Sequence, residues 1–98
     1  MIEVSEIARM AILETLQSSG AGPDKGLRLK QEDKGVTLHI DVPKNDDQVT
    51  WHNKSIVLIV EPDTAGKIGS AVVDVEEGPE EAHLVLRHKI SKSLEKTL

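Results

Sequence analysis

Apolar residues recur at helical spacing near the start of the chain. The segment Glu6–Gln17 consists of good helix formers, and its apolar positions cover one broad side: Ile7, Ala8, Ala11, Ile12 and Leu16. Ser5 precedes this segment and can cap it by accepting a backbone N–H of the first turn. The pattern therefore predicts a helix over 6–17 that packs one face on a sheet and ends before Gly20.

From Gly26 onward the pattern changes to the two-residue alternation of strands. In 27–30 the leucines alternate with Arg28 and Lys30, which are expected to point outward. Residues 36–42 alternate as well, and their apolar positions share one predicted face: Val36, Leu38, Ile40 and Val42. The charged segment 31–35 between them is expected to be a turn, which makes a hairpin.

A second hairpin is predicted after the polar loop 43–47. Its strands are Gln48–Trp51 and Ser55–Val60, and the turn is expected at 52–54, where Asn53 tolerates turn geometry. Because Ser55–Val60 is almost continuously apolar, we expect it to be the central strand, buried on both faces.

The remaining pattern predicts one more helix and two more strands. Pro62 suits a first helical turn, and Gly66 and Gly69 limit that helix to one or two turns. Strands are expected at 71–75 and 82–87, on either side of an acidic turn at 76–81. In the tail, Ile90, Leu94 and Leu98 would align on a helix, but nine residues are too few for an independent one. A frayed tail and a docked tail both stay open.

Length and charge narrow the class of protein. Ninety-eight residues make one domain, expected at 1–89, with a tail at 90–98. The formal charge of −5 disfavours nucleic acid as a partner. The longest apolar run, Ile56–Val60, is strand-sized, so no membrane span is expected. Acidic Glu3 and Glu6 and the lack of an apolar h-region argue against a secretory signal, and we expect a cytoplasmic protein.

The absence of cysteine excludes several kinds of chemistry at once. With no cysteine in the chain, disulfides, thiolate zinc sites, thiolate ligation of an iron-sulfur cluster and cysteine nucleophiles are all impossible. The only aromatic residue is Trp51. The core must therefore consist almost entirely of aliphatic side chains.

The order of these elements resembles the HesB/IscA-like family, the A-type iron-sulfur assembly proteins. The matching segments run in register through the chain: Ile2–Ser5, Gly26–Leu29, Asp47–Val49, Ile56–Asp63 and Gly69–Gly78. The resemblance covers about residues 2 to 89 and implies a small α+β domain. That domain would have a mostly antiparallel or mixed β-sheet, an N-terminal helix and a short second helix. It also implies the family activity, which is to hold and pass on iron or a cluster.

The sequence departs from the family where the family's ligands lie. Members carry one cysteine in a Gly-rich loop between the first two core strands and a Cys-Gly-Cys near the C-terminus. Here the corresponding segments, 31–35 and 90–98, contain no cysteine. No ligand position can be carried over, so neither iron nor an iron-sulfur cluster is expected as a cofactor.

Histidines and carboxylates are the remaining candidates for a metal site. His39, His83 and His88 could ligate a transition metal, and His52 lies at a predicted turn. His83 and His88 are five apart, which places them on opposite faces of one strand. The plainer interpretation is that all four are solvated or packed histidines. No calcium-loop spacing, nucleophile elbow or phosphate-binding loop accompanies them.

The hypothesis that best fits these observations is a non-enzymatic accessory or regulatory protein that acts by protein–protein contact, connected with iron-sulfur or sulfur metabolism. The candidate contacts are Trp51 and the acidic residues of 76–81, namely Glu76, Glu77, Glu80 and Glu81, although such charge runs are usually just solvated. The alternatives are an iron-binding protein with histidine and carboxylate ligands, and a small His/Glu acid-base enzyme. Monomer and homodimer are both compatible with the sequence.

Overall fold

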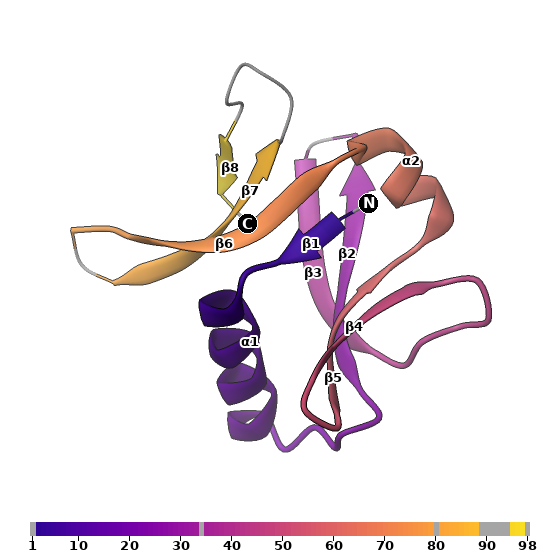
Figure 1. Cartoon of the computed structure of the whole chain (residues 1–98), viewed down its shortest axis with the longest axis vertical. Coiled ribbons are helices and arrows are strands. Elements are labelled where there is room, and N and C mark those ends of the chain that lie inside the picture. Colours follow the sequence, from indigo (N-terminus) through magenta and orange to yellow (C-terminus); the bar gives the residue numbers. More distant parts are fainter. Residues whose placement is uncertain (1, 34, 80, 89–94, 98) are drawn as a thin grey trace.

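Short strands make up most of the structure, a computed structural model that describes residues 2–33, 35–79, 81–88 and 95–97 (Figure 1). In chain order its elements are β1 (Ile2–Val4), α1 (Glu6–Ser18), β2 (Gly26–Glu32), β3 (Gly35–Asp41), β4 (Gln48–His52), β5 (Ser55–Val60), α2 (Pro62–Ile68), β6 (Ala71–Glu77), β7 (Ala82–His88) and β8 (Glu95–Thr97).

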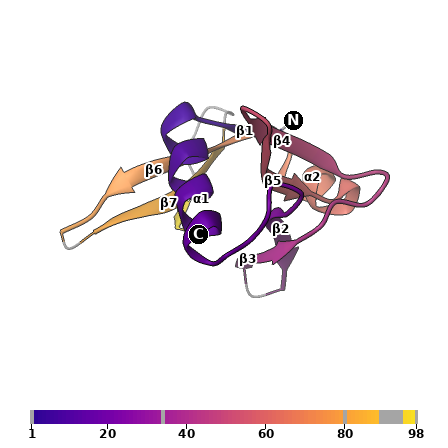
Figure 2. The same ribbon diagram turned by 90° about the horizontal axis from the view of Figure 1, so that it is seen from below.

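The strands form two sheets of four. One sheet has the order β1-β6-β7-β8 and the other has the order β3-β2-β5-β4. Each sheet contains one parallel pair, β1 with β6 and β2 with β5, and the other pairs are antiparallel. The predicted α+β class with a mixed, mostly antiparallel arrangement is confirmed, but the strands divide between two sheets. Figure 2 shows the two sheets side by side, with α1 between the β6–β7 hairpin and the sheet that contains β5.

Helix α1 begins as the sequence predicted. The Ser5 hydroxyl accepts the backbone N–H of Ala8 at 3.2 Å, which satisfies one of the free donors of the first turn. Its buried stripe of Ala8, Ile12 and Leu16 packs mainly on β5 and β6. Ile7 was expected on this face, and that prediction is wrong. Its side chain is 62% exposed because it lies on the far side of the helix.

Strand β5 is the most deeply buried strand, as predicted. Residues Ile56 to Val60 are all at most 4% exposed, because β5 lies between β2 and β4 and is covered by α1. The core around it is aliphatic, and its buried members come from both sheets and both helices: Ile2, Val4, Ala8, Ile12, Leu16, Leu27, Leu29, Val57, Leu58, Val60, Ile68, Ala71, Val73 and Leu86.

Turns are tighter than the sequence indicated. Strand β2 continues to Glu32 and β3 begins at Gly35, so the first turn is shorter than the predicted 31–35. Strand β4 continues through His52, so the second turn is shorter than the predicted 52–54. Asn53 adopts φ = 56°, the left-handed conformation that was expected of it. Gly66 lies inside α2 and does not end it. Gly69, with φ = 75°, is the C-cap.

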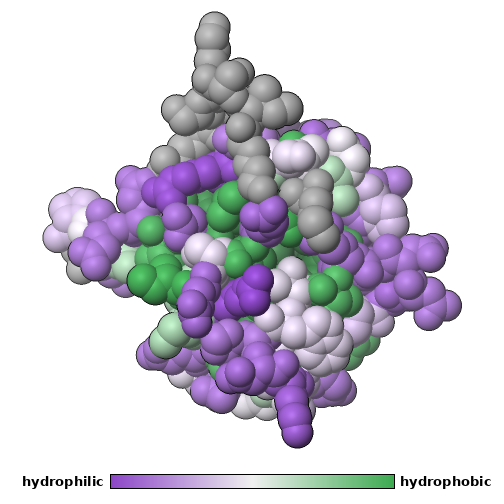
Figure 3. Space-filling view, in the orientation of Figure 1, coloured by the Kyte–Doolittle hydropathy of each residue, from purple (hydrophilic) through white to green (hydrophobic). Residues whose placement is uncertain are grey.

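The β6–β7 hairpin is longer than predicted. Glu76 and Glu77 belong to β6 and pair with His83 and Ala82, so the acidic turn is confined to the residues after Glu77. In Figure 1 this hairpin extends away from the second sheet, and Figure 3 shows mainly hydrophilic residues at its far end.

Only half of the apolar side chains predicted to share one face of β3 pack against the core. Val36 and Leu38 pack against the core, whereas Ile40 is 41% and Val42 is 44% exposed. The C-terminal end of the strand therefore carries its apolar side chains on the surface.

Side-chain hydrogen bonds join the two sheets at β1. The side-chain amide of Gln48 donates to the carbonyl of Ile2 at 2.6 Å. Arg9 donates through Nε to the carbonyl of Val4 at 3.1 Å and through Nη1 to the carbonyl of Trp51 at 3.4 Å. Because Ile2 and Val4 are two apart in a strand, their carbonyls point the same way, away from β6. The open edge of β1 is thus closed by side chains.

The C-terminal tail adds an edge strand where it is described. Residues 95–97 form β8, which pairs antiparallel with β7, so the helical spacing noted for the tail does not produce a helix there. Residues 89–94 and Leu98 lie outside the described residues. None of the helices in the described part of the chain is long and apolar enough to cross a membrane.

Candidate functional site

The main polar feature of the structure is a buried arginine, Arg28. Strand alternation places Arg28 on the opposite face of β2 from Leu27 and Leu29, as expected. That face is not open to solvent, however, and Arg28 is only 2% exposed. The prediction that Arg28 points into water is therefore wrong, because the residues that cover it come from three other parts of the chain.

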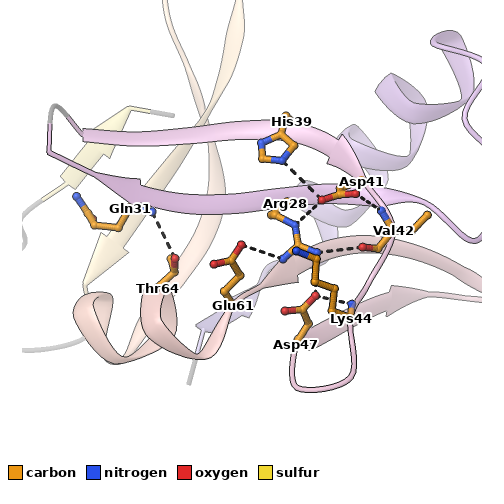
Figure 4. A network of polar contacts seen from close by, with 9 residues as sticks. All are labelled: Arg28, Gln31, His39, Asp41, Val42, Lys44, Asp47, Glu61 and Thr64. Atoms are coloured by element: carbon orange, nitrogen blue, oxygen red, sulfur yellow. Dashed lines mark hydrogen bonds and ion pairs between the residues drawn. The ribbon is translucent and has the colours of Figure 1, made fainter.

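The guanidinium of Arg28 is bound by three carboxylates and one carbonyl (Figure 4). Its Nε donates to Asp41 at 2.8 Å, its Nη2 donates to Asp47 at 2.8 Å and to the carbonyl of Val42 at 3.0 Å, and its Nη1 lies 3.4 Å from Glu61. Asp41 ends β3, Asp47 precedes β4 and Glu61 is the N-cap residue of α2. One side chain therefore connects a sheet, a loop and a helix.

Asp47 is the most enclosed of the three carboxylates. Its side chain is 3% exposed, compared with 34% for Asp41 and 28% for Glu61. It also accepts the backbone N–H of Lys44 at 2.7 Å, which closes the loop before β4 into a tight turn. Arg28 and this turn thus hold each other in place.

Electrostatics reinforce the cluster. The hydrogen bond from Arg28 holds the pKa of Asp47 below its ordinary value. The pKa of Asp41 is lowered first by the backbone N–H of Val42 and then by Arg28. The hydrogen bond to Asp47 raises the pKa of Arg28, against the opposing effect of burial. All three groups are therefore charged at neutral pH.

A hollow of about 470 Å³ lies beside this cluster, between the loop and the start of α2. It is lined by Lys44, Asn45, Asp46, Asp47, Glu61, Pro62 and Asp63. Because Asp47 and Glu61 are engaged by Arg28, the exposed charges on the rim are Lys44, Asp46 and Asp63. No histidine lines this hollow.

The predicted metal candidates do not come together. His39 lies on β3 in one sheet, whereas His83 and His88 lie on β7 in the other. His39 is 52% exposed, and its Nε2 lies 3.8 Å from Asp41, a carboxylate already bound to Arg28. The His83 ring lies against Gly78 of the acidic turn. Among the described residues, no group of three or more histidine and acidic side chains could hold a metal ion.

The predicted contact residues have different surroundings. Trp51 lies on β4 and is 50% exposed, so about half of its surface is accessible to solvent. Glu76 lies 3.3 Å from Arg87, which also binds Asp74, so Glu76 belongs to an ion network on the sheet surface. Glu77 and Glu81 are exposed on either side of the turn. Glu80 lies outside the described residues.

Sequence reasoning missed the Arg28 cluster altogether. Arg28 pairs with residues 13, 19 and 33 positions further along the chain, and no local pattern connects them. The available signal was an arginine between two core leucines in a strand next to the central one. In that position an arginine needs buried acidic partners.

Comparisons with known proteins identify solved structures that share this fold. No protein-family model matches the sequence, and no curated protein matches it. Among solved structures, SufA of Escherichia coli, which is involved in the biosynthesis of iron-sulfur clusters, superposes with a TM-score of 0.72 and 19% identity. That match covers 92% of this chain and 87% of SufA.

A second solved structure has a similar fold. IscA with its 2Fe–2S cluster superposes with a TM-score of 0.60 and 16% identity, over 91% of this chain and 86% of IscA. The chain has the HesB/IscA-like fold. The fold implied by the sequence resemblance is thereby confirmed, although this chain has no cysteine to bind a cluster through thiolates.

Proposed function

We propose that this chain is a non-enzymatic accessory protein of iron-sulfur cluster biosynthesis that acts by contact with a protein partner. The observation that carries the proposal is a HesB/IscA-like fold, retained over 92% of the chain, without a single cysteine. A cluster carrier needs thiolates or an equivalent ligand set. Among the described residues, histidines and carboxylates form no such set, which favours contact with a partner over cluster transfer.

Trp51 supports this proposal at the level of a residue. Tryptophan is enriched among the residues that contribute most to protein–protein affinity, and here it is half-exposed on an edge strand. Its carbonyl accepts a hydrogen bond from Arg9 of α1 at 3.4 Å, which connects this part of β4 to the helix. We place the protein in the cytoplasm, where it would work without a membrane or nucleic acid.

Metal analysis of the untagged protein tests the absence of a cluster. The protein is analysed as isolated and after anaerobic incubation with ferrous iron and sulfide. We expect no stoichiometric iron. Stoichiometric iron that is lost in His39→Ala or His83→Ala would instead support a carrier with histidine ligands, and the accessory role would be wrong.

The link to cluster biosynthesis is tested in the source organism. A strain without the chain should show reduced aconitase activity under iron limitation, because aconitase depends on an assembled cluster. The wild-type chain should restore this activity and Trp51→Ala should not. Gln17→Ala, a change at an exposed position on α1, is the matched control and should restore it. Full activity in the deletion strain would contradict the proposal.

A further inference from the structure

The edges of the two sheets differ in how they are protected. An edge strand presents unpaired N–H and C=O groups to any extended chain that approaches, and proteins usually block such edges with bulges, charges, proline or covering side chains. The four edge strands here are β1 and β8 in one sheet and β3 and β4 in the other.

Three of these edges are blocked or short. The outward carbonyls of β1 accept hydrogen bonds from Gln48 and Arg9. Strand β4 has a register shift between Thr50 and Trp51, and Arg9 binds the carbonyl of Trp51. Strand β8 is only three residues long. Each of these features disfavours pairing with another chain.

Strand β3 is less protected than the others. The side-chain amide of Gln31 lies 3.5 Å from the carbonyl of Gly35 at its first residue, but the strand is neither short nor bulged. All seven of its residues pair with β2 in one unbroken antiparallel register, from Gly35 opposite Glu32 to Asp41 opposite Gly26. It contains no lysine, proline or bulge. Figure 2 shows β3 as the outermost strand of its sheet. Thr37, His39 and Ile40 are exposed on it, so an approaching strand would meet little obstruction.

We propose that β3 pairs antiparallel with β3 of a second copy of this chain, in a register centred on Leu38. In that register Leu38 faces its own equivalent, Thr37 faces His39, Val36 faces Ile40 and Gly35 faces Asp41. The two four-stranded sheets become one continuous eight-stranded sheet. The inference concerns self-association and does not depend on the accessory role proposed above.

Charge and apolar matching favour a second copy as the occupant. No like charges face each other, because the acidic end of β3 meets the glycine at its other end, and Asp41 stays bound to Arg28. Opposed side chains in an antiparallel pair interact directly. Ile40, 41% exposed in the single chain, would lie against Val36 of the second copy. The apolar row would then run unbroken across the two-fold axis.

Two charge variants that share one substitution test this register. Thr37→Glu/His39→Glu places carboxylates opposite each other twice in the dimer. Thr37→Glu/His39→Lys places a carboxylate opposite an ammonium twice. The change at position 37, opposite Lys30 of β2, is common to both variants. The two differ only at position 39, which lies opposite Arg28. Thermal unfolding of each variant at low concentration checks that the fold is retained.

Sedimentation equilibrium across a wide range of protein concentration measures the dimer dissociation constant of the wild type and of each variant. We expect a reversible dimer for the wild type. We also expect a dimer dissociation constant roughly tenfold lower for the Glu/Lys variant than for the Glu/Glu variant, because two opposed pairs change sign. A wild type and a Glu/Lys variant that both stay monomeric would overturn the proposal. A dimer that is equally strong in both variants would also overturn it, because that dimer would use another surface.

Discussion

At the scale of single residues, Arg28 is a buried charge that connects β3, the loop before β4 and the start of α2. Arg28→Met leaves the carboxylate of Asp47, 3% exposed, without its partner. Breaking a buried ion pair from one side is strongly unfavourable, so we expect the free energy of unfolding in urea to fall by about 3 kcal/mol. Lys30→Met, an exposed change on the same strand, is the control and should alter the free energy of unfolding by less than about 0.5 kcal/mol. Equal effects of the two variants would show that the cluster does not stabilise the fold.

The pH dependence of stability follows from the same cluster. The pKa of Asp47 and that of Asp41 are both lower in the folded chain than the ordinary value of 3.8. Their contribution to stability is therefore complete above that value and is lost as the pH falls through the lower folded-state pKa. Urea unfolding between pH 5 and pH 2 should show this loss, and Asp47→Asn should make it shallower. If the unfolding free energy of the wild type and that of Asp47→Asn changed with pH to the same extent, the loss of stability could not be assigned to Asp47.

Individual residues show which features of the structure a sequence can predict and which it cannot. Ser5 was recognised as a cap and Asn53 as a turn residue, because the chemistry that matters lies within a few positions of each. Arg28 was misplaced because its environment is made by Asp41, Asp47 and Glu61, which only the complete fold brings together. Ile40 was misplaced for the converse reason, since nothing local reveals that the core ends before it.

At the scale of elements, the contact between β2 and β5 depends on a glycine. A Cβ on Gly26 would lie 2.6 Å from Cγ2 of Ile56 and 3.1 Å from the carbonyl oxygen of Val57. Gly26→Ala should therefore force apart two buried strands and cost about 1–3 kcal/mol of unfolding free energy. Gly66→Ala is the matched control, because Gly66 is exposed within α2 and a Cβ there meets nothing within 4 Å. It should stabilise the chain by up to about 1 kcal/mol. A Gly26→Ala chain as stable as the wild type would show that the strands can separate at no cost.

Element order was predictable here, and element ends were not. The apolar run of β5 and the helical spacing of α1 identify their elements directly. The polar strand ends, such as Glu76 and Glu77 in β6, look like turn residues in the sequence. They are held in the strand by pairing with β7, a long-range contact that composition does not reveal.

At the scale of the whole molecule, the hydrogen bonds that close β1 also hold the two sheets together. No local pattern in the sequence indicated a second sheet. Arg9→Met combined with Gln48→Met would leave the carbonyls of Ile2 and Val4 without these donors. Each lost hydrogen bond should cost about 1 kcal/mol. The local effect is more diagnostic: amide hydrogen exchange should accelerate in β1 and in the β6 residues that pair with it, Ala71 to Val73, while β2 and β5 keep their protection. Glu14→Gln, an exposed change on the outside of α1, should leave all four strands unaltered. Uniform acceleration across both sheets would mean that the sheets unfold as one unit and that β1 has no separate role in joining them.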